Sequence, residues 1–309
     1  MSEQRCAVVA VLGAPNAGKS TLVNALVGAK VAAVTQKVQT TRALVRGIAM
    51  RGDVQLILID TPGVFAPKRR LERAMVAAAW SALEGVDAII HVVDAAAHAG
   101  AGKRGADARA VEDSATIAAK LKEMELASIL ALNKVDAVPR PVLLEMTAKL
   151  VEEGLYTDVF MIAAKKGDGV EDIARALAER APEGPWLFPE DQTMDAPARV
   201  LAAEITREKA MQRLHDELPY EMTVETESWE ERKDGSAKID QIIYVARESQ
   251  RKIAIGAKGA TVKAIGEAAR KEMEAALDRR VHLFLHVKVR EGWSEERALY
   301  RRLGLDWDA

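Results

Sequence analysis

Residues 13–21 read Gly-Ala-Pro-Asn-Ala-Gly-Lys-Ser-Thr, which matches the phosphate-binding pattern GxxxxGK[ST]. Glycines allow such a loop to turn its backbone N–H groups inward around a phosphate. The apolar run 6–12 precedes the loop, and the stretch 21–27, of helical character, follows it. A Gly-rich turn that binds nothing is the alternative, but a buried strand that leads into a helix favours a nucleotide-binding α/β domain.

Each part of the loop has an expected task. The helix that begins near Gly18 directs its positive end at the phosphates. Lys19 adds a point charge for the β- and γ-phosphates, and the Ser20 hydroxyl can bind Mg²⁺. The residues of the loop expected to contact phosphate are Gly13, Asn16, Ala17, Gly18, Lys19, Ser20 and Thr21.

The composition is that of an ordinary soluble globular chain. The 309 residues suggest about two domains, and the net charge of −2 identifies no partner. Cys6 is the only cysteine, which excludes an internal disulfide and favours a reducing compartment. We expect a cytoplasmic protein because no signal peptide precedes the first apolar run and no apolar stretch approaches 18 residues.

Up to residue 181, short apolar runs alternate with stretches of helical period, which predicts a mostly parallel sheet covered on both faces. The runs cover residues 6–12, 56–60, 88–94, 128–133 and 158–163. Gly52-Asp53 lies between 42–51 and 54–60 and is a hairpin signal, so one antiparallel edge strand is expected. The Ala- and Gly-rich stretch 95–112 predicts a mobile surface insertion.

The pattern changes after residue 181. Residues 182–197 contain four prolines and predict an extended linker between domain 1–181 and domain 198–309. The second domain is expected to be α+β. Its predicted elements are a helix at 198–214, strands at 219–227 and 238–247, a helical stretch at 253–277 around a glycine break, a strand at 282–289 and a helix at 295–303.

Two further motifs select the nucleotide. In Asp60-Thr61-Pro62-Gly63, the Asp60 carboxylate can hold a Mg²⁺-bound water and the Gly63 N–H can sense a γ-phosphate. In Asn133-Lys134-Val135-Asp136, Asp136 can accept both adjacent donors of guanine, which adenine lacks. Asn133 can bond the base and brace the phosphate loop, and the Lys134 stem can cover a base face. A strand-end turn with a helix cap is the alternative for residues 133–136.

In this order, the three motifs resemble those of translation-factor-type GTPases. The resemblance implies a switch made of Thr40, Thr41, Asp60 and Gly63. It implies Ser20, Thr41 and Asp60 as the Mg²⁺ ligands, with Thr40 as the second choice for the threonine. It also places the fifth GTPase element at 162–165, where Ala164 and Lys165 would meet the guanine oxygen through their backbone N–H groups. Ala163 replaces the usual serine, so nucleotide affinity is expected to be lower.

The residue after Gly63 is Val64 rather than the water-orienting glutamine of Ras-like GTPases, and Phe65 follows it. This resembles GTPases in which a phosphate-loop asparagine helps to hold K⁺. Asn16 stands at that position, with a simple turn residue as the alternative. Slow intrinsic turnover is expected, with GTP or GDP, Mg²⁺ and a K⁺ ion as the bound groups.

A second loop, Gly256-Ala257-Lys258-Gly259, interrupts a helical pattern and matches the GxxG loop of KH domains, which clamps single-stranded RNA. An ordinary helix break is the alternative. The surrounding residues 247–290 contain 11 Lys/Arg and 5 Asp/Glu, a local charge of +6. Ile253, Ile255 and Val262 could pack against bases. The expected RNA contacts are Arg251, Lys252, Gly256, Ala257, Lys258, Gly259 and Lys263.

A P-loop GTPase domain followed by an α-first KH domain resembles the Era family from end to end. The stretches 217–220 (ELPY), 251–263 and 267–272 (EAARKE) are also similar to that family. The resemblance implies binding near the 3′ end of 16S rRNA and a role in assembly of the small ribosomal subunit from its 30S precursor. It also implies a weak peripheral contact with the cytoplasmic face of the inner membrane, through a basic face alone. No oligomer is implied.

Two functions therefore stay open at this point. One is a GTP-hydrolysing switch that gates RNA binding, and the other is an RNA-binding assembly factor whose nucleotide is mainly structural. A metabolic P-loop enzyme is disfavoured, because residues 60–63 and 133–136 would have no task in it.

Overall fold

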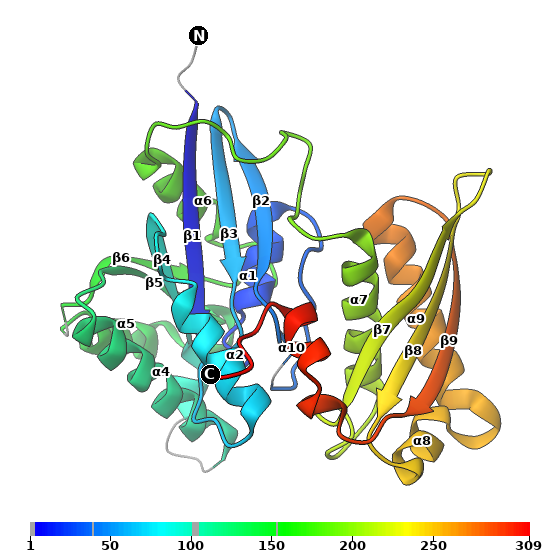
Figure 1. Cartoon of the computed structure of the whole chain (residues 1–309). Coiled ribbons are helices and arrows are strands. Elements are labelled where there is room, and N and C mark those ends of the chain that lie inside the picture. Colours follow the sequence, from blue (N-terminus) through cyan, green and yellow to red (C-terminus); the bar gives the residue numbers. More distant parts are fainter. Residues whose placement is uncertain (1–3, 39, 101–104, 153) are drawn as a thin grey trace. The chain divides into compact units, whose positions relative to one another are not determined.

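The computed structural model describes residues 4–38, 40–100, 105–152 and 154–309, and its contacts divide the chain into two units (Figure 1). The first unit comprises Met1–Ala32, Thr41–Asp195 and Leu303–Ala309, and the second comprises Ala33–Thr40 and Ala196–Arg302. The expected boundaries, 1–181, 182–197 and 198–309, differ from this division in three places. Residues 33–40 group with the second unit, whereas 182–195 and 303–309 group with the first.

The stretch predicted as an extended linker is bonded to the first unit at several points along its length. The Cys6 N–H donates to the Pro182 carbonyl at 3.1 Å, and the Ile48 N–H donates to the Thr193 carbonyl at 2.9 Å. The buried Gln55 side chain accepts the N–H groups of Leu187 and Phe188. Its prolines prevent a regular strand, but the other backbone groups still find partners.

The sheet of the first unit has six strands in the order β2-β3-β1-β4-β5-β6. All neighbours are parallel except β2 and β3, which form the expected antiparallel hairpin. The strands are β1 (Arg5–Gly13), β2 (Val45–Arg51), β3 (Val54–Asp60), β4 (Ala88–Asp94), β5 (Ser128–Asn133) and β6 (Tyr156–Ile162).

Helices cover both faces of this sheet because the central strands are apolar on both sides (Figure 1). In β1, Val9 and Val11 belong to the core cluster that contains α1 and α6, whereas Ala10 and Leu12 belong to the cluster of α2 and α4. The helices are α1 (Lys19–Val27), α2 (Arg70–Ser81), α3 (Ala95–Gly100), α4 (Ala106–Glu123), the 3₁₀ turn η1 (Val135–Ala137), α5 (Arg140–Val151) and α6 (Val170–Arg180).

The expectation of a mobile insertion at 95–112 is wrong for most of that stretch. Residues 95–100 form α3 and residues 106–112 form the start of α4, while 101–104 lie outside the described residues. Alanine is the best helix former, and Ala95 and Ala97 are buried, so the composition favours packed helices here.

The second unit has a three-stranded sheet in the order β7-β8-β9, with β7 and β8 antiparallel and β8 and β9 parallel. Helices α7, α8 and α9 share one core cluster with it. Its elements are α7 (Ala198–Arg213), β7 (Met222–Glu231), β8 (Ala237–Val245), α8 (Glu248–Ile255), the 3₁₀ turn η2 (Ala257–Gly259), α9 (Ala260–Leu277), β9 (Val281–Val289), the 3₁₀ turn η3 (Trp293–Glu295) and α10 (Arg297–Leu303), which ends at the first residue of the last first-unit segment. This is the predicted order of an α-first KH module.

Within the described part of the chain, no helix combines the length and the apolar character needed to cross a membrane.

Candidate functional site

The phosphate loop joins β1 to α1, and its geometry requires glycine at position 18. Gly18 has a φ of 103°, which side-chain-bearing residues rarely adopt, and a Cβ there would lie 2.1 Å from Nδ2 of Asn133. The close approach brings the phosphate loop and the motif 133–136 together. Asn16, with a φ of 63°, occupies the left-handed region that asparagine tolerates.

Lys19 is buried at the start of α1 and lies over the loop. Its Nζ donates to the carbonyls of Gly13 and Ala14, each at 3.0 Å. An ammonium has three donors, so the loop binds two of them. Burial lowers the pKa of Lys19 to about 8, although the nearby Asp60 charge opposes this shift. A phosphate bound at the loop would place a negative charge beside this desolvated ammonium and would stabilise its charged form.

Three oxygen-bearing side chains meet where Mg²⁺ is expected. The Ser20 Oγ donates to Asp60 Oδ2 at 2.6 Å, and the Thr41 Oγ1 lies 2.9 Å from Ser20 Oγ and 3.2 Å from Asp60 Oδ2. The other carboxylate oxygen, Asp60 Oδ1, is buried without a hydrogen-bond partner. Such an oxygen set with an unsatisfied carboxylate fits a hard divalent cation.

The choice between the two candidate threonines follows from the same geometry. Thr41 joins Ser20 and Asp60, whereas the Thr40 hydroxyl donates to the Lys37 carbonyl at 2.7 Å and lies 2.6 Å from Thr35 Oγ1. Burial raises the pKa of Asp60 to about 6, against the opposing effects of Ser20, Lys19 and Thr41.

Gly63 approaches the phosphate loop closely. A Cβ at Gly63 would lie 2.9 Å from the Cα of Pro15, and the Val64 N–H donates to the Gly13 carbonyl at 3.2 Å. The Val64 side chain is buried in the core cluster of α2 and α4, so it cannot orient a water molecule. Phe65 is half-buried.

Asn133 contacts the phosphate loop, as expected, and also the stretch 162–165, which was not expected. Its Nδ2 donates to the Ala17 carbonyl at 2.8 Å, and its Oδ1 accepts the Ala164 N–H at 3.0 Å. The next residue, Lys134, has a φ of 62°, and its Nζ binds the Asp94 carboxylate. The first GTPase loop and the fifth element at 162–165 are therefore held by one amide side chain.

Asp136 has a partner that the motif did not predict. Lys166 Nζ lies 2.9 Å from Asp136 Oδ2, and this hydrogen bond holds the pKa of Asp136 below its ordinary value. The shift favours the ionised carboxylate, which can only accept hydrogen bonds. The only signal in the sequence is a second lysine directly after Lys165. Ala163, in place of serine, is fixed through its backbone, because its N–H donates to the Asp168 carbonyl at 3.0 Å.

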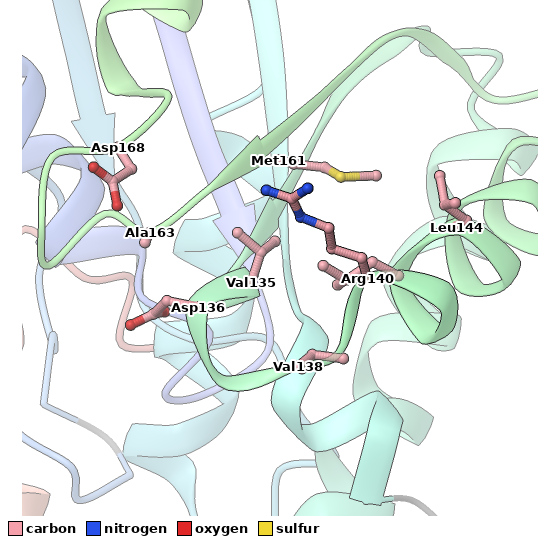
Figure 2. A pocket seen from close by; sticks show the side chains of 9 residues that line it. Val135, Asp136, Val138, Arg140, Leu144, Met161, Ala163 and Asp168 are labelled. Atoms are coloured by element: carbon pink, nitrogen blue, oxygen red, sulfur yellow. The ribbon is translucent and has the colours of Figure 1, made fainter.

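A pocket of about 440 Å³ lies beside Asp136, and Figure 2 shows the side chains that line it. Leu144 and Met161 line one side, and Asp136 and Ala163 lie on the other. The Asn133, Lys134 and Lys165 side chains do not line it. The cavity therefore adjoins the expected base site rather than coinciding with it.

The GxxG loop joins α8 to α9 in the second unit. Gly256 has a φ of 74°, and a Cβ there would lie 2.2 Å from Oγ1 of Thr261, so the fold itself requires this glycine. Gly259 has a φ of 79° and open space around it. Ala257 and Lys258 are exposed between them. The loop thus presents backbone and one ammonium to solvent, as a phosphate clamp requires.

The predicted RNA contacts around this loop divide into two groups. Lys252 and Lys263 are exposed, but Arg251 is bonded inward to the Val287 carbonyl at 3.2 Å and to Glu248 at 2.8 Å. Ile253 is 59% exposed, whereas Ile255 and Val262 pack against the core. Of the three aliphatic candidates, Ile253 alone is presented fully to solvent.

Comparisons with known proteins match stretches in both parts of the chain. A family model described as 50S ribosome-binding GTPase matches residues 8–134, and one described as KH domain matches residues 217–294. GTPase Era of Caulobacter vibrioides is 56% identical over 310 residues, which cover 99% of this chain and 98% of the relative. GTPase Era of Maricaulis maris is 55% identical, again with 99% and 98% coverage.

The chain belongs to the Era family of GTPases.

Two solved structures extend this result to the fold. One is Era in complex with MgGDPNP and nucleotides 1506–1542 of 16S ribosomal RNA, with 34% identity, a TM-score of 0.85 and coverage of 97% of this chain and 99% of that chain. The other is a single-residue variant of Aquifex aeolicus Era bound to GDP·AlF4⁻, with 34% identity, a TM-score of 0.87 and the same coverage. The expected GTPase domain, the KH domain and the GTPase activity of an Era protein are confirmed.

Proposed function

We propose that this Era-family GTPase binds GTP and Mg²⁺ at the phosphate loop and uses the bound nucleotide to control RNA binding by its KH domain. One observation carries the nucleotide- and Mg²⁺-binding part of the proposal. The hydroxyls of Ser20 and Thr41 meet the Asp60 carboxylate, whose Oδ1 is buried without a hydrogen-bond partner. A site built only to stabilise the fold would satisfy that oxygen.

The chain's own groups account for nucleotide binding and hydrolysis. Lys19 exchanges its two loop carbonyls for β- and γ-phosphate oxygens, and the Gly63 N–H meets the γ-phosphate. Ser20 and Thr41 would hold Mg²⁺, with Asp60 holding one of its water molecules, and the ion would neutralise charge on the phosphates. Asp136 accepts the two guanine donors. Because Val64 is buried, no side chain at this position orients the attacking water, so intrinsic turnover is slow.

We further propose that the GxxG loop binds the 3′ segment of 16S rRNA during assembly of the small subunit from its 30S precursor. The exposed Lys252, Lys258 and Lys263 supply attraction to phosphates, and the glycines of the loop allow close approach. The solved Era complex with nucleotides 1506–1542 of 16S ribosomal RNA supports this choice of RNA. The same lysines support a weak peripheral contact with anionic lipid at the cytoplasmic face of the inner membrane.

The experiment compares Ser20→Ala with Thr116→Ala, a control that removes an exposed hydroxyl from α4. Hydrolysis of GTP is followed as a function of Mg²⁺ concentration, and binding of a labelled 16S 3′ oligonucleotide is measured beside a scrambled sequence. Ser20→Ala should lose at least about 10-fold in Mg²⁺-dependent hydrolysis, and Thr116→Ala should match the unmodified protein. Equal hydrolysis by both variants, or equal binding of both oligonucleotides, would overturn the corresponding half of the proposal.

A further inference from the structure

The last residue of β4, Asp94, lies beside the motif 133–136, although none of the nucleotide-binding motifs includes it. In the register of the parallel strands, Asp94 is paired with Asn133, the last residue of β5. Both strands therefore end at the edge of the sheet where a ligand of such a fold is bound. At this edge the Asp94 carboxylate contacts Lys134, which lies 40 residues further along the chain.

The Asp94 carboxylate has a fixed direction. Its Oδ1 accepts the Ala97 N–H at 3.1 Å, in the first turn of α3. This contact is a helix N-cap, which satisfies a backbone donor that the helix itself leaves free. Only 11% of the Asp94 side chain is exposed. The other oxygen, Oδ2, is therefore held in one orientation, toward Lys134.

Lys134 is held at both ends of its side chain. Its backbone follows Asn133, whose amide binds the Ala17 carbonyl and the Ala164 N–H. At the other end, Lys134 Nζ lies 2.5 Å from Asp94 Oδ2. A lysine stem has four carbons and many rotamers when it is free. Between these two fixed points the stem is restrained before any nucleotide binds.

Fold stability alone does not account for this ion pair. The Lys134 side chain is 39% exposed, and ion pairs with this access to solvent contribute little to folding. Capping of α3 uses only the Oδ1 atom of Asp94. The pair lies next to Asn133 and Asp136, the residues proposed to bind the base, so its effect falls on the base site.

We infer that Asp94 is a positioning residue for guanine binding: by holding the Lys134 ammonium, it keeps the lysine stem where it can cover a face of the base. This inference rests on the proposed role of residues 133–136 in base recognition. A long side chain that is already fixed loses less conformational entropy when the ligand binds. GTP and GDP share the base, so loss of the Asp94 charge should weaken both by the same factor and leave the Mg²⁺ requirement unchanged.

The test compares Asp94→Asn with Asp158→Asn. Asparagine keeps a carbonyl oxygen for the Ala97 N–H, so α3 stays capped while the charge that holds Lys134 is removed. Asp158 also binds a cation, with Oδ1 2.7 Å from an Arg180 nitrogen, but it lies near the start of β6, away from the carboxyl ends of the strands. The control therefore removes an ion pair of the same kind from the same unit.

Affinities for GDP and for a non-hydrolysable GTP analogue are measured on the full chain over a range of Mg²⁺ concentrations. Asp94→Asn should weaken both nucleotides by about 3- to 10-fold, the factor that corresponds to immobilising one long side chain on binding. Asp158→Asn should change neither affinity.

A double-variant cycle separates positioning through Lys134 from a merely structural effect. Lys134→Met keeps an apolar stem but removes the ammonium, so it should weaken both nucleotides by a similar factor. Adding Asp94→Asn to Lys134→Met should then cause no further loss, because the group on which Asp94 acts is already absent.

Unchanged nucleotide affinity in Asp94→Asn or in Lys134→Met would overturn the inference. A loss confined to one nucleotide would also overturn it, as would an equal loss from Asp94→Asn with and without the Lys134 ammonium. Lys134 is only half-buried, so Lys134→Met tests the inference even if Asp94→Asn fails to fold. If the unmodified protein binds ADP as tightly as GDP, the proposed base site itself fails.

Discussion

At the scale of single residues, Asp136 is the residue proposed to select the base. The hydrogen bond from Lys166 holds the pKa of Asp136 below its ordinary value, and an ionised carboxylate accepts hydrogen bonds but donates none. Asp136→Asn should weaken GTP binding by about 100-fold, because one guanine donor is left facing an amide N–H. The same variant should gain affinity for xanthosine triphosphate, which carries a carbonyl where guanine has its amine.

Nucleotide competition measures this exchange, and Asp168→Asn is the matched control. Asp168 is exposed and lines the same cavity, so its substitution removes the same charge close to the base site (Figure 2). If Asp136→Asn keeps the preference for GTP, Asp136 does not read the base.

His91 makes stability depend on pH. It lies fully buried in β4, with Nδ1 2.8 Å from the Tyr156 hydroxyl and Nε2 3.3 Å from Ser114 Oγ. Burial, with smaller effects of His98 and Lys19, lowers the pKa of His91 to about 3 from its ordinary value of 6.5. Between these values the unfolded chain binds a proton that the folded chain does not. Stability is therefore full above pH 6.5 and falls as the pH is lowered toward 3.

Urea unfolding of the unmodified protein and of His91→Phe at about pH 7.5 and about pH 5 tests this dependence. The unmodified protein should lose about 2 kcal/mol more than the variant over this interval, since each pH unit below about 6.5 costs about 1.4 kcal/mol. The variant is less stable at both pH values because the hydrogen bonds of His91 to Tyr156 and Ser114 are lost, so only the difference between pH values counts. Identical pH dependence in the two proteins would exclude His91 as the source.

At the scale of elements, the phosphate loop contains the residue proposed to help hold K⁺, Asn16. Its φ of 63° is what a simple turn residue would show, so the K⁺ hypothesis depends on hydrolysis measurements. Asn16→Gly removes the amide and leaves the backbone unstrained, because glycine adopts a positive φ freely. Alanine at this position would introduce strain. If K⁺ assists hydrolysis, turnover in KCl should exceed turnover in NaCl at equal ionic strength, and Asn16→Gly should abolish the difference. Equal rates in both salts for the unmodified protein would end the hypothesis.

The GxxG loop can be tested with a matched control, because Gly235, outside the loop, has nearly the same backbone conformation as Gly259. Gly259 has a φ of 79° and Gly235, in the β7–β8 turn, has a φ of 80°, and a Cβ at either meets open space. Gly259→Asp and Gly235→Asp therefore introduce the same charge and similar strain. We expect Gly259→Asp to weaken binding of the 16S 3′ oligonucleotide by at least about 10-fold through repulsion and bulk at the clamp. Gly235→Asp should bind normally, and both variants should hydrolyse GTP at the basal rate.

Elements with a strong local signal are predicted correctly from the sequence. The apolar runs at 88–94 and 128–133 coincide with β4 and β5, and the GxxG break falls between α8 and α9. The stretch 95–112 is predicted incorrectly. An alanine-rich composition suits both a surface loop and a packed helix, and only the burial of Ala95 and Ala97 decides between them. The prolines of residues 182–195 predict irregular backbone, which says nothing about whether that backbone is bonded to a neighbour.

Side-chain partners are less predictable than motifs. Ser20, Thr41 and Asp60 meet as their motifs imply, but the ion pair of Lys166 with Asp136 depends on how two loops approach each other. Likewise, Arg207 appears in the sequence as one cation on an amphipathic helix. Its hydrogen bond to the Thr40 carbonyl depends on contacts 167 residues apart in the chain.

At the scale of the whole molecule, the central claim is that GTP and RNA affect each other's binding. The chain passes from residues 33–40, which group with the second unit, directly into Thr41 of the first. Linkage then requires the effect to be reciprocal: if GTP tightens RNA binding, RNA tightens GTP binding by the same factor.

The most direct test is a closed thermodynamic cycle on the full chain. Affinity for the 16S 3′ oligonucleotide is measured with a GTP analogue and with GDP, and affinity for each nucleotide is measured with and without the oligonucleotide. The account predicts a coupling factor of about 10 or more that is equal in both directions. A factor near one in both directions would contradict it and would leave an RNA-binding factor whose nucleotide is mainly structural.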